Sequence, residues 1–212
     1  MRKILLVLAC VVLAGCSTEK KETSESPKSA AKKPTPEKFK VRFDTTKGTF
    51  DMDCTREWAP NGADRMYELV QQGFFDDSRF FRVIKGFMVQ FGLSKDPKQN
   101  ELWSQLQILD DPVKQSNKRG YVTFAKRGPN TRTTQIFINF VDNPMLDGQG
   151  FAPVCVVSDD GMQVVDKLYN VYGESIPRGN GPEQGKIMAM GNEYLTRNFP
   201  NLDAITTAKI VQ

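Results

Sequence analysis

The chemistry open to this sequence is restricted first by a missing residue type, because the chain contains no histidine. The usual serine–histidine and cysteine–histidine nucleophilic sites are therefore excluded, as are most zinc sites. The glycine-rich stretch 178–187 includes Gly185-Lys186 but lacks the other residues of a phosphate-binding loop, so we predict an ordinary loop. Adjacent acidic pairs are typical of turns and helix caps: Asp76-Asp77, Asp110-Asp111 and Asp159-Asp160. Any reaction must then proceed without a titrating base or nucleophile.

Two segments of the chain place Arg82 and two glutamines among apolar residues. Residues 80–92 read FFRVIKGFMVQFG, and residues 125–140 read AKRGPNTRTTQIFINF. These segments resemble the signatures of the cyclophilin family, whose first signature reads phenylalanine–histidine–arginine–valine–isoleucine and later glycine–phenylalanine–methionine–valine–glutamine. Further stretches match in family order: TTKGTFDMD, GFFDDSRF, LDGQGFAP and GPEQGKIMAMGNEYL. The resemblance covers residues 39–212 and implies peptidyl-prolyl cis–trans isomerase activity without a cofactor.

An arginine beside apolar side chains suits this activity chemically. Taken alone, Arg82 would be interpreted as a surface guanidinium stacked on a neighbouring phenylalanine ring. Peptide-bond rotation faces a barrier of about 18–20 kcal/mol, and the prolyl nitrogen regains a lone pair in the twisted transition state. A guanidinium can donate a hydrogen bond to that lone pair without exchanging a proton, which contributes about 1.5–3 kcal/mol. The remaining stabilisation must come from binding the twisted geometry in a dry, preorganised site.

The resemblance implies one catalytic residue, Arg82, and a set of substrate-binding residues around it. Four apolar members match positions that line the proline pocket, and two glutamines match amides that hold the substrate backbone. One alanine matches a small residue whose backbone faces the bound peptide. In this order they are Phe87, Met88, Phe137, Leu146, Gln90, Gln135 and Ala125. Without the resemblance, apolar residues at such spacing would be interpreted as ordinary core.

Several positions depart from the family pattern, and three of them complete the predicted binding set. Lys126 and Met145 stand where members often carry asparagine and tryptophan, and Phe151 lies in the region of a late histidine. Outside this set, Phe81 replaces a histidine and Phe91 replaces a glycine. We expect the second change to redirect the loop from 91 to 100.

The segments that must position these residues have mostly β character. Alternating apolar and charged residues on either side of Lys47-Gly48 predict a β-hairpin. Further strands are expected at 80–84, 87–91, 121–125, 134–140, 152–158 and 203–211. Helical spacing of apolar residues predicts two helices, at 62–72 and 161–171. The fold class is therefore mainly β, and the resemblance implies a closed eight-stranded antiparallel β-barrel capped by two α-helices.

The first residues indicate export. Arg2 and Lys3 precede the run ILLVLACVVLAG, which is typical of a secretory signal and too short to span a membrane comfortably. Residues 13–16 resemble the bacterial lipobox, which implies that residues 1–15 are removed and that lipidated Cys16, carrying acyl chains such as palmitate, anchors the protein to a membrane, facing the periplasm. The alternative is an ordinary signal peptide with an incidental cysteine.

The composition of the remaining chain separates a linker from one folded domain. Residues 16–38 are rich in Lys, Glu, Ser and Pro and are predicted to be disordered, whereas 39–212 form the isomerase domain. The net charge of +4 falls to +2 once Arg2 and Lys3 are removed, which is too weak to indicate nucleic acid. Cys54 and Cys155 remain, and either a disulfide or two buried thiols would suit them.

Three functional classes stay open for this domain. The leading hypothesis is a monomeric isomerase that assists the folding of exported proteins near a membrane, with unfolded or partly folded proline-containing polypeptides as partners. The rival is a membrane-tethered binding module or holdase that grips proline-containing segments with little turnover. Arg82 and the two glutamines favour the enzyme, because binding alone needs no donor aimed at a developing lone pair. A purely structural lipoprotein is the weakest alternative, since it requires no concave site of this composition.

Overall fold

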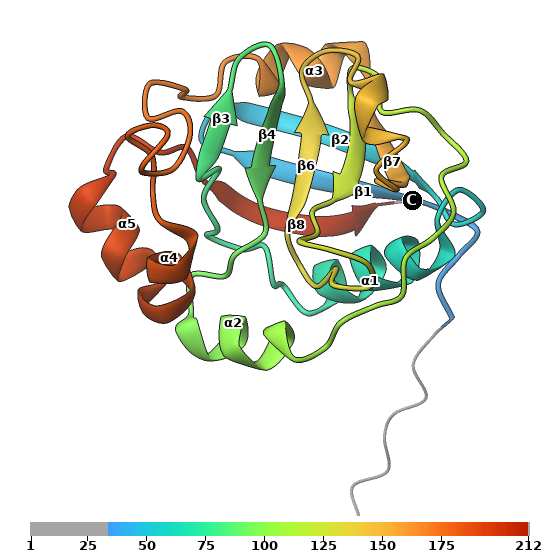
Figure 1. Ribbon diagram of the computed structural model, residues 1–212, viewed down its shortest axis with the longest axis horizontal. Helices are drawn as coiled ribbons and strands as arrows, with labels where there is room; N and C mark the ends of the chain where they lie inside the picture. Colours follow the sequence, from blue (N-terminus) through green and yellow to red (C-terminus); the bar gives the residue numbers. More distant parts are fainter. Residues whose placement is uncertain (1–33, 212) are drawn as a thin grey trace, which may run out of the picture. The chain divides into compact units, whose positions relative to one another are not determined.

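The structure is a computed structural model that describes residues 34–211, and the predictions for residues 1–33 lie outside this range. A curled antiparallel sheet of eight strands dominates it (Figure 1). In chain order they are β1 (Lys38–Thr45), β2 (Gly48–Thr55), β3 (Arg82–Ile84), β4 (Met88–Phe91), β5 (Tyr121–Phe124), β6 (Ile136–Asn139), β7 (Pro153–Val157) and β8 (Ile205–Val211). Their order across the sheet is β3-β4-β6-β5-β7-β2-β1-β8. The predicted mainly β fold with eight antiparallel strands is confirmed.

The sheet is an open half-barrel, so the expectation of a closed barrel is corrected. Its edge strands are β3 and β8, and no ladder joins them within residues 34–211. Strand β3 has three residues, because a turn at 85–87 follows it at once. The gap is bridged by the segment before β3, where Phe80 N–H donates to Asp203 O (3.0 Å) and Ile205 N–H donates to Ser78 O (2.9 Å).

Five α-helices accompany the sheet in the described part of the chain, which corrects the prediction of two. The predicted helices are α1 (Pro60–Gln71) and α3 (Asp159–Val165). The additional ones are α2 (Pro97–Ser104), α4 (Gln184–Met190) and α5 (Asn192–Asn198), and a short 3-10 helix, η1, spans Pro144–Leu146. Helix α4 begins inside the stretch 178–187 that was expected to be loop throughout. Each additional helix has seven or eight residues, too few for a helical period to stand out.

Phenylalanine side chains fill the centre of the molecule. The Phe91 ring is fully buried, with its centre 5.1 Å from Phe80 and 5.8 Å from Phe43. This packing explains a large side chain where the family carries glycine. The chain then leaves β4 through Gly92, whose φ of 98° suits glycine, and continues towards α2. Phe81, which replaces a histidine, packs instead with Ile187 and other residues of the α4–α5 pair beside β3 (Figure 1).

Cys54 and Cys155 form a disulfide that joins β2 to β7. The two residues stand directly opposite each other in that ladder, and both are buried. The structure therefore selects the disulfide from the two possibilities that the sequence left open. Between residues 34 and 211, the helices are too short or too polar to cross a membrane.

Candidate active site

A cavity of about 800 Å³ opens beside β3, β4 and β6. Most of the predicted site residues line it: Arg82, Phe87, Met88, Gln90, Ala125, Lys126, Gln135, Phe137, Leu146 and Phe151. Met145 does not, because η1 turns Leu146 inward and leaves the neighbouring Met145 58% exposed on the surface. The sequence thus identifies residues that converge on one cavity, and the structure leaves Met145 outside it.

The apolar part of the cavity is a small cluster separate from the main core. Its buried members are Met88 from β4, Phe137 from β6 and Leu146 from η1. The rings of Phe137 and Phe151 meet edge to face, with centres 5.8 Å apart. Ile84, Phe87 and Ala125 pack against the cluster while remaining partly exposed. A concave apolar surface of this kind can hold a ring that has no polar atoms, such as the pyrrolidine ring of proline.

Arg82 sits at the polar border of this apolar cluster. Its Nη1 donates to Gln90 Oε1 (3.0 Å) and lies 3.8 Å from Met88 Sδ. Its Nε and Nη2 donate to the two carboxylate oxygens of Glu174, at 2.7 and 2.6 Å. Nη1 is therefore the guanidinium nitrogen in contact with the apolar cluster, while the other two are held by the carboxylate.

Gln90 and Gln135 continue from Arg82 as a chain of hydrogen bonds with a defined direction. A guanidinium has no acceptor, so Gln90 must present Oε1 to Arg82 and donate from Nε2 to Gln135 Oε1 (2.8 Å). Gln135 Nε2 is left without an acceptor among residues 34–211. This amide is consequently available to donate to a carbonyl oxygen of a bound peptide.

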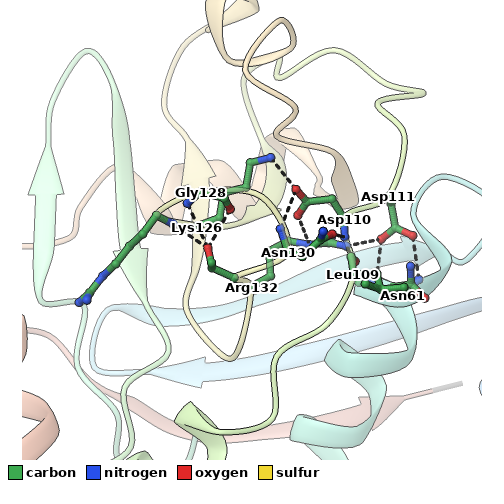
Figure 2. A network of polar contacts seen from close by, with 11 residues as sticks. Asn61, Leu109, Asp110, Asp111, Lys126, Gly128, Asn130 and Arg132 are labelled. Carbon is green, nitrogen blue, oxygen red and sulfur yellow. Dashed lines mark hydrogen bonds and ion pairs between the residues drawn. The ribbon is translucent and has the colours of Figure 1, made fainter.

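Lys126 reaches the cavity, but its ammonium group is already engaged. Nζ donates to Asp110 Oδ2 (3.0 Å; Figure 2) and lies 5.5 Å from the centre of the Phe151 ring. Burial disfavours the charge of Asp110, yet hydrogen bonds from Lys126 and the Asn130 N–H outweigh it and lower the pKa of this carboxyl. The charge of Lys126 therefore holds the cavity wall, and a substrate meets its backbone or its aliphatic stem.

The acidic pair Asp110-Asp111 fastens this wall to helix α1 (Figure 2). Asp111 accepts from the N–H groups of Asn61 and Gly62, at 3.0 and 2.9 Å, in the first turn of α1. It also accepts from Arg132 Nη2 (3.0 Å), which contacts the Leu109 carbonyl as well. The pair was predicted to belong to a turn or a cap, and Asp111 does cap a helix, but through Asn61, which lies 50 positions earlier in the chain.

Sequence reasoning missed several residues that line the cavity, and Glu174 is the one among them that binds Arg82. It lies 92 positions from Arg82, and no motif marks it. The nearest signal is the glycine-rich stretch 178–187 that follows it. Hydrogen bonds from Arg82 lower the pKa of Glu174 below its ordinary value, so the carboxylate is charged at neutral pH.

Residues 40–191 match the family described as cyclophilin type peptidyl-prolyl cis-trans isomerase/CLD. The chain belongs to this family. It is therefore a cyclophilin-type peptidyl-prolyl cis–trans isomerase. Of the functional classes considered from the sequence, the family assignment supports the enzyme and not the pure binding module.

Bacterial cyclophilin-type relatives cover much of the chain. It is 33% identical over 186 residues to peptidyl-prolyl cis-trans isomerase A of Dickeya dadantii, covering 82% of this chain and 92% of the relative. It is 32% identical over 147 residues to peptidyl-prolyl cis-trans isomerase B of Escherichia coli, covering 62% and 84%.

A solved structure shares the fold at lower sequence identity. The crystal structure of a cyclophilin type peptidyl-prolyl cis-trans isomerase from Cryptosporidium parvum has a TM-score of 0.61 and 20% identity, covering 82% of this chain and 98% of that one. A second crystal structure of the same protein, in the presence of the dipeptide Ala-Pro, has a TM-score of 0.59. The likeness supports the same arrangement of strands.

The activity of this cyclophilin-type isomerase should not depend on pH near neutrality. No histidine is available to titrate, and the pKa of Glu174, which contacts Arg82, is lowered. A lowered pKa means that the ion pair is intact at neutral pH and is lost only as the pH falls through that value. We expect kcat/KM to stay within about twofold between about pH 6 and 8. A stopped-flow profile with a bell shape centred in this window would contradict the expectation.

Proposed function

We propose that this isomerase accelerates rotation of X-Pro bonds in unfolded or partly folded exported polypeptides, as a monomer anchored to a bacterial membrane through lipidated Cys16. The observation that carries the export part is the buried disulfide between Cys54 and Cys155. Disulfides persist in oxidising compartments outside the cytoplasm and are rare inside it. The signal-like start and the sequence Leu13-Ala14-Gly15-Cys16 support the same location.

The proposed mechanism assigns each part of the cavity one task. The proline ring enters the cluster of Met88, Phe137 and Leu146, which removes it from water. Gln135 Nε2 donates to a backbone carbonyl of the bound peptide. This hydrogen bond holds that carbonyl group in place while the X-Pro bond rotates. Arg82 Nη1 donates to the prolyl nitrogen as that atom regains its lone pair, a bond that is stronger in the transition state than in the planar ground state. The Ala-Pro dipeptide named with the Cryptosporidium parvum structure supports a proline ligand for this cavity.

The proposed anchor can be tested by replacing one cysteine at a time with alanine. In full-length chains expressed in a Gram-negative bacterium, the wild-type chain should carry palmitate label and Cys16→Ala should not. The acyl chains contribute about 0.8 kcal/mol for each buried methylene, so the labelled wild-type protein should stay in the membrane fraction. Cys10→Ala is the matched control, because it lies inside the apolar run that is removed. A Cys16→Ala chain that still carries palmitate label, or a wild-type chain without label, would refute the lipid anchor.

A further inference from the structure

The ion pair between Arg82 and Glu174 shapes what the arginine can do. Both carboxylate oxygens are used, with Oε1 accepting from Nε at 2.7 Å and Oε2 accepting from Nη2 at 2.6 Å. The two side chains are 20% and 21% exposed, so water competes little for these bonds. A two-point pair of this kind fixes both the position and the plane of a guanidinium. Arg82 is consequently held from the side opposite to the apolar cluster.

The donors that remain on Arg82 face the cavity. One N–H of Nη1 bonds Gln90 Oε1 at 3.0 Å, and Nη1 also lies 3.8 Å from Met88 Sδ. A thioether sulfur is a weak acceptor, so this second N–H can be taken over by a better one. The carboxylate therefore leaves an available donor at the border of the apolar cluster.

The segment 173–182, which we call the Glu174 loop, closes on itself around this residue. Gly181 N–H donates to Glu174 O (2.7 Å), and Ser175 Oγ donates to Pro182 O (2.6 Å). Gly179 and Gly181 press against the Glu174 carbonyl so closely that a Cβ on either residue would collide with it. Glycines in this part of the sequence thus allow a tight loop that presents Glu174 to Arg82.

We propose that Glu174 is a positioning residue for the isomerase reaction, and that the Glu174 loop serves to place its carboxylate against Arg82. The inference rests on the proposed role of Arg82 in donating to the prolyl nitrogen. Glu174 touches the guanidinium, and in this role it acts through Arg82 alone. A carboxylate that merely neutralised Arg82 would have the opposite effect on the rate, so the sign of the change is informative.

The test compares the kinetics of Glu174→Ala and Glu174→Gln in the full-length chain purified in detergent. Glu174→Ala should lower kcat about 10- to 100-fold while KM changes less than about threefold, because misplacing a catalytic group by 1 Å has effects of this size. Glu174→Gln keeps one oxygen acceptor and should recover part of the lost kcat. In a ¹⁵N spectrum, the Arg82 Nε–H resonance should move in both variants. Glu193→Ala is the control, because it removes an equally charged side chain that is 67% exposed on α5 and lies outside the cavity lining.

A double-mutant cycle separates positioning from structural support. If Glu174 acts through Arg82, adding Glu174→Ala to Arg82→Ala should cause no further loss. A further loss in that background, equal losses in Glu193→Ala and Glu174→Ala, or an unchanged or raised kcat in Glu174→Ala would overturn the inference. An inactive Arg82→Ala together with a fully active Glu174→Ala would refute the positioning role and spare the proposed mechanism. A fully active Arg82→Ala would refute both.

Discussion

Arg82→Ala is expected to lower kcat/KM for a proline tetrapeptide about 100-fold, with the fold unchanged. The variant removes a charged donor from a partly dry cavity, and loss of one preorganised donor of this kind typically costs a factor of about 10²–10³. It also leaves Glu174 and Gln90 without the partner that now binds both. The measurement is cis-to-trans isomerisation followed by stopped flow, with circular dichroism as the check on folding.

Two further variants make the Arg82 result specific. Arg197→Ala removes an equally charged side chain that is 69% exposed on α5, and it should leave kcat/KM unchanged. Arg82→Lys keeps the charge but cannot pair side-on with Glu174 while also bonding Gln90, so it should remain close to Arg82→Ala. An Arg82→Ala enzyme with wild-type kcat/KM would mean that the apolar cluster and the glutamines suffice for catalysis.

Removing the disulfide is expected to lower the free energy of unfolding by about 4–5 kcal/mol without changing kcat. Cys54 and Cys155 are 101 positions apart, and a cross-link that closes a loop of this length restricts the unfolded chain by about that amount in the chain-entropy account. The bond lies in the β2–β7 ladder, away from the residues that line the cavity. Urea denaturation of the Cys54→Ala/Cys155→Ala variant measures the change.

The control for this prediction is urea denaturation in the presence of a reductant, which breaks the disulfide of the unfolded wild-type chain. Dithiothreitol should lower the urea midpoint of the wild-type domain and leave that of the double alanine variant unchanged. A wild-type domain whose midpoint does not respond to reduction would show that the cross-link contributes nothing to stability. Unchanged activity below the unfolding transition would show that the disulfide supports the fold and takes no part in the reaction.

Local patterns along the chain predicted the sheet well and the helices poorly. A strand with one buried face alternates with period two, so Phe50, Met52 and Cys54 mark β2 within a few residues. Short helices lack this redundancy. Helix α2 buries just Asn100 and Trp103, and its best signal is Asp96-Pro97, where the Asp96 side chain accepts from Lys98 N–H (2.9 Å). A helix start is therefore encoded at Asp96-Pro97, although no apolar period follows it.

The prediction of a closed barrel was wrong for a different reason. The presence and direction of a strand follow from its own residues, but closure depends on whether two edges far apart in sequence have enough length to pair. Strand β3 ends after Ile84, so the contact with β8 is made by the irregular segment that contains Ser78 and Phe80. The residues of either segment alone do not predict that this contact replaces strand pairing.

The sequence by itself determined which residue types this protein can use: Arg82 and two glutamines among apolar residues, no histidine, and segments that match the cyclophilin family. The tertiary structure alone decided which groups are free to act. It paired Cys54 with Cys155, tied Lys126 to Asp110, turned Met145 outward and brought Glu174 onto Arg82 across 92 positions. Residue types follow from the sequence, but a side-chain partner depends on where two distant backbone segments meet, and that is set by the packing of the whole domain.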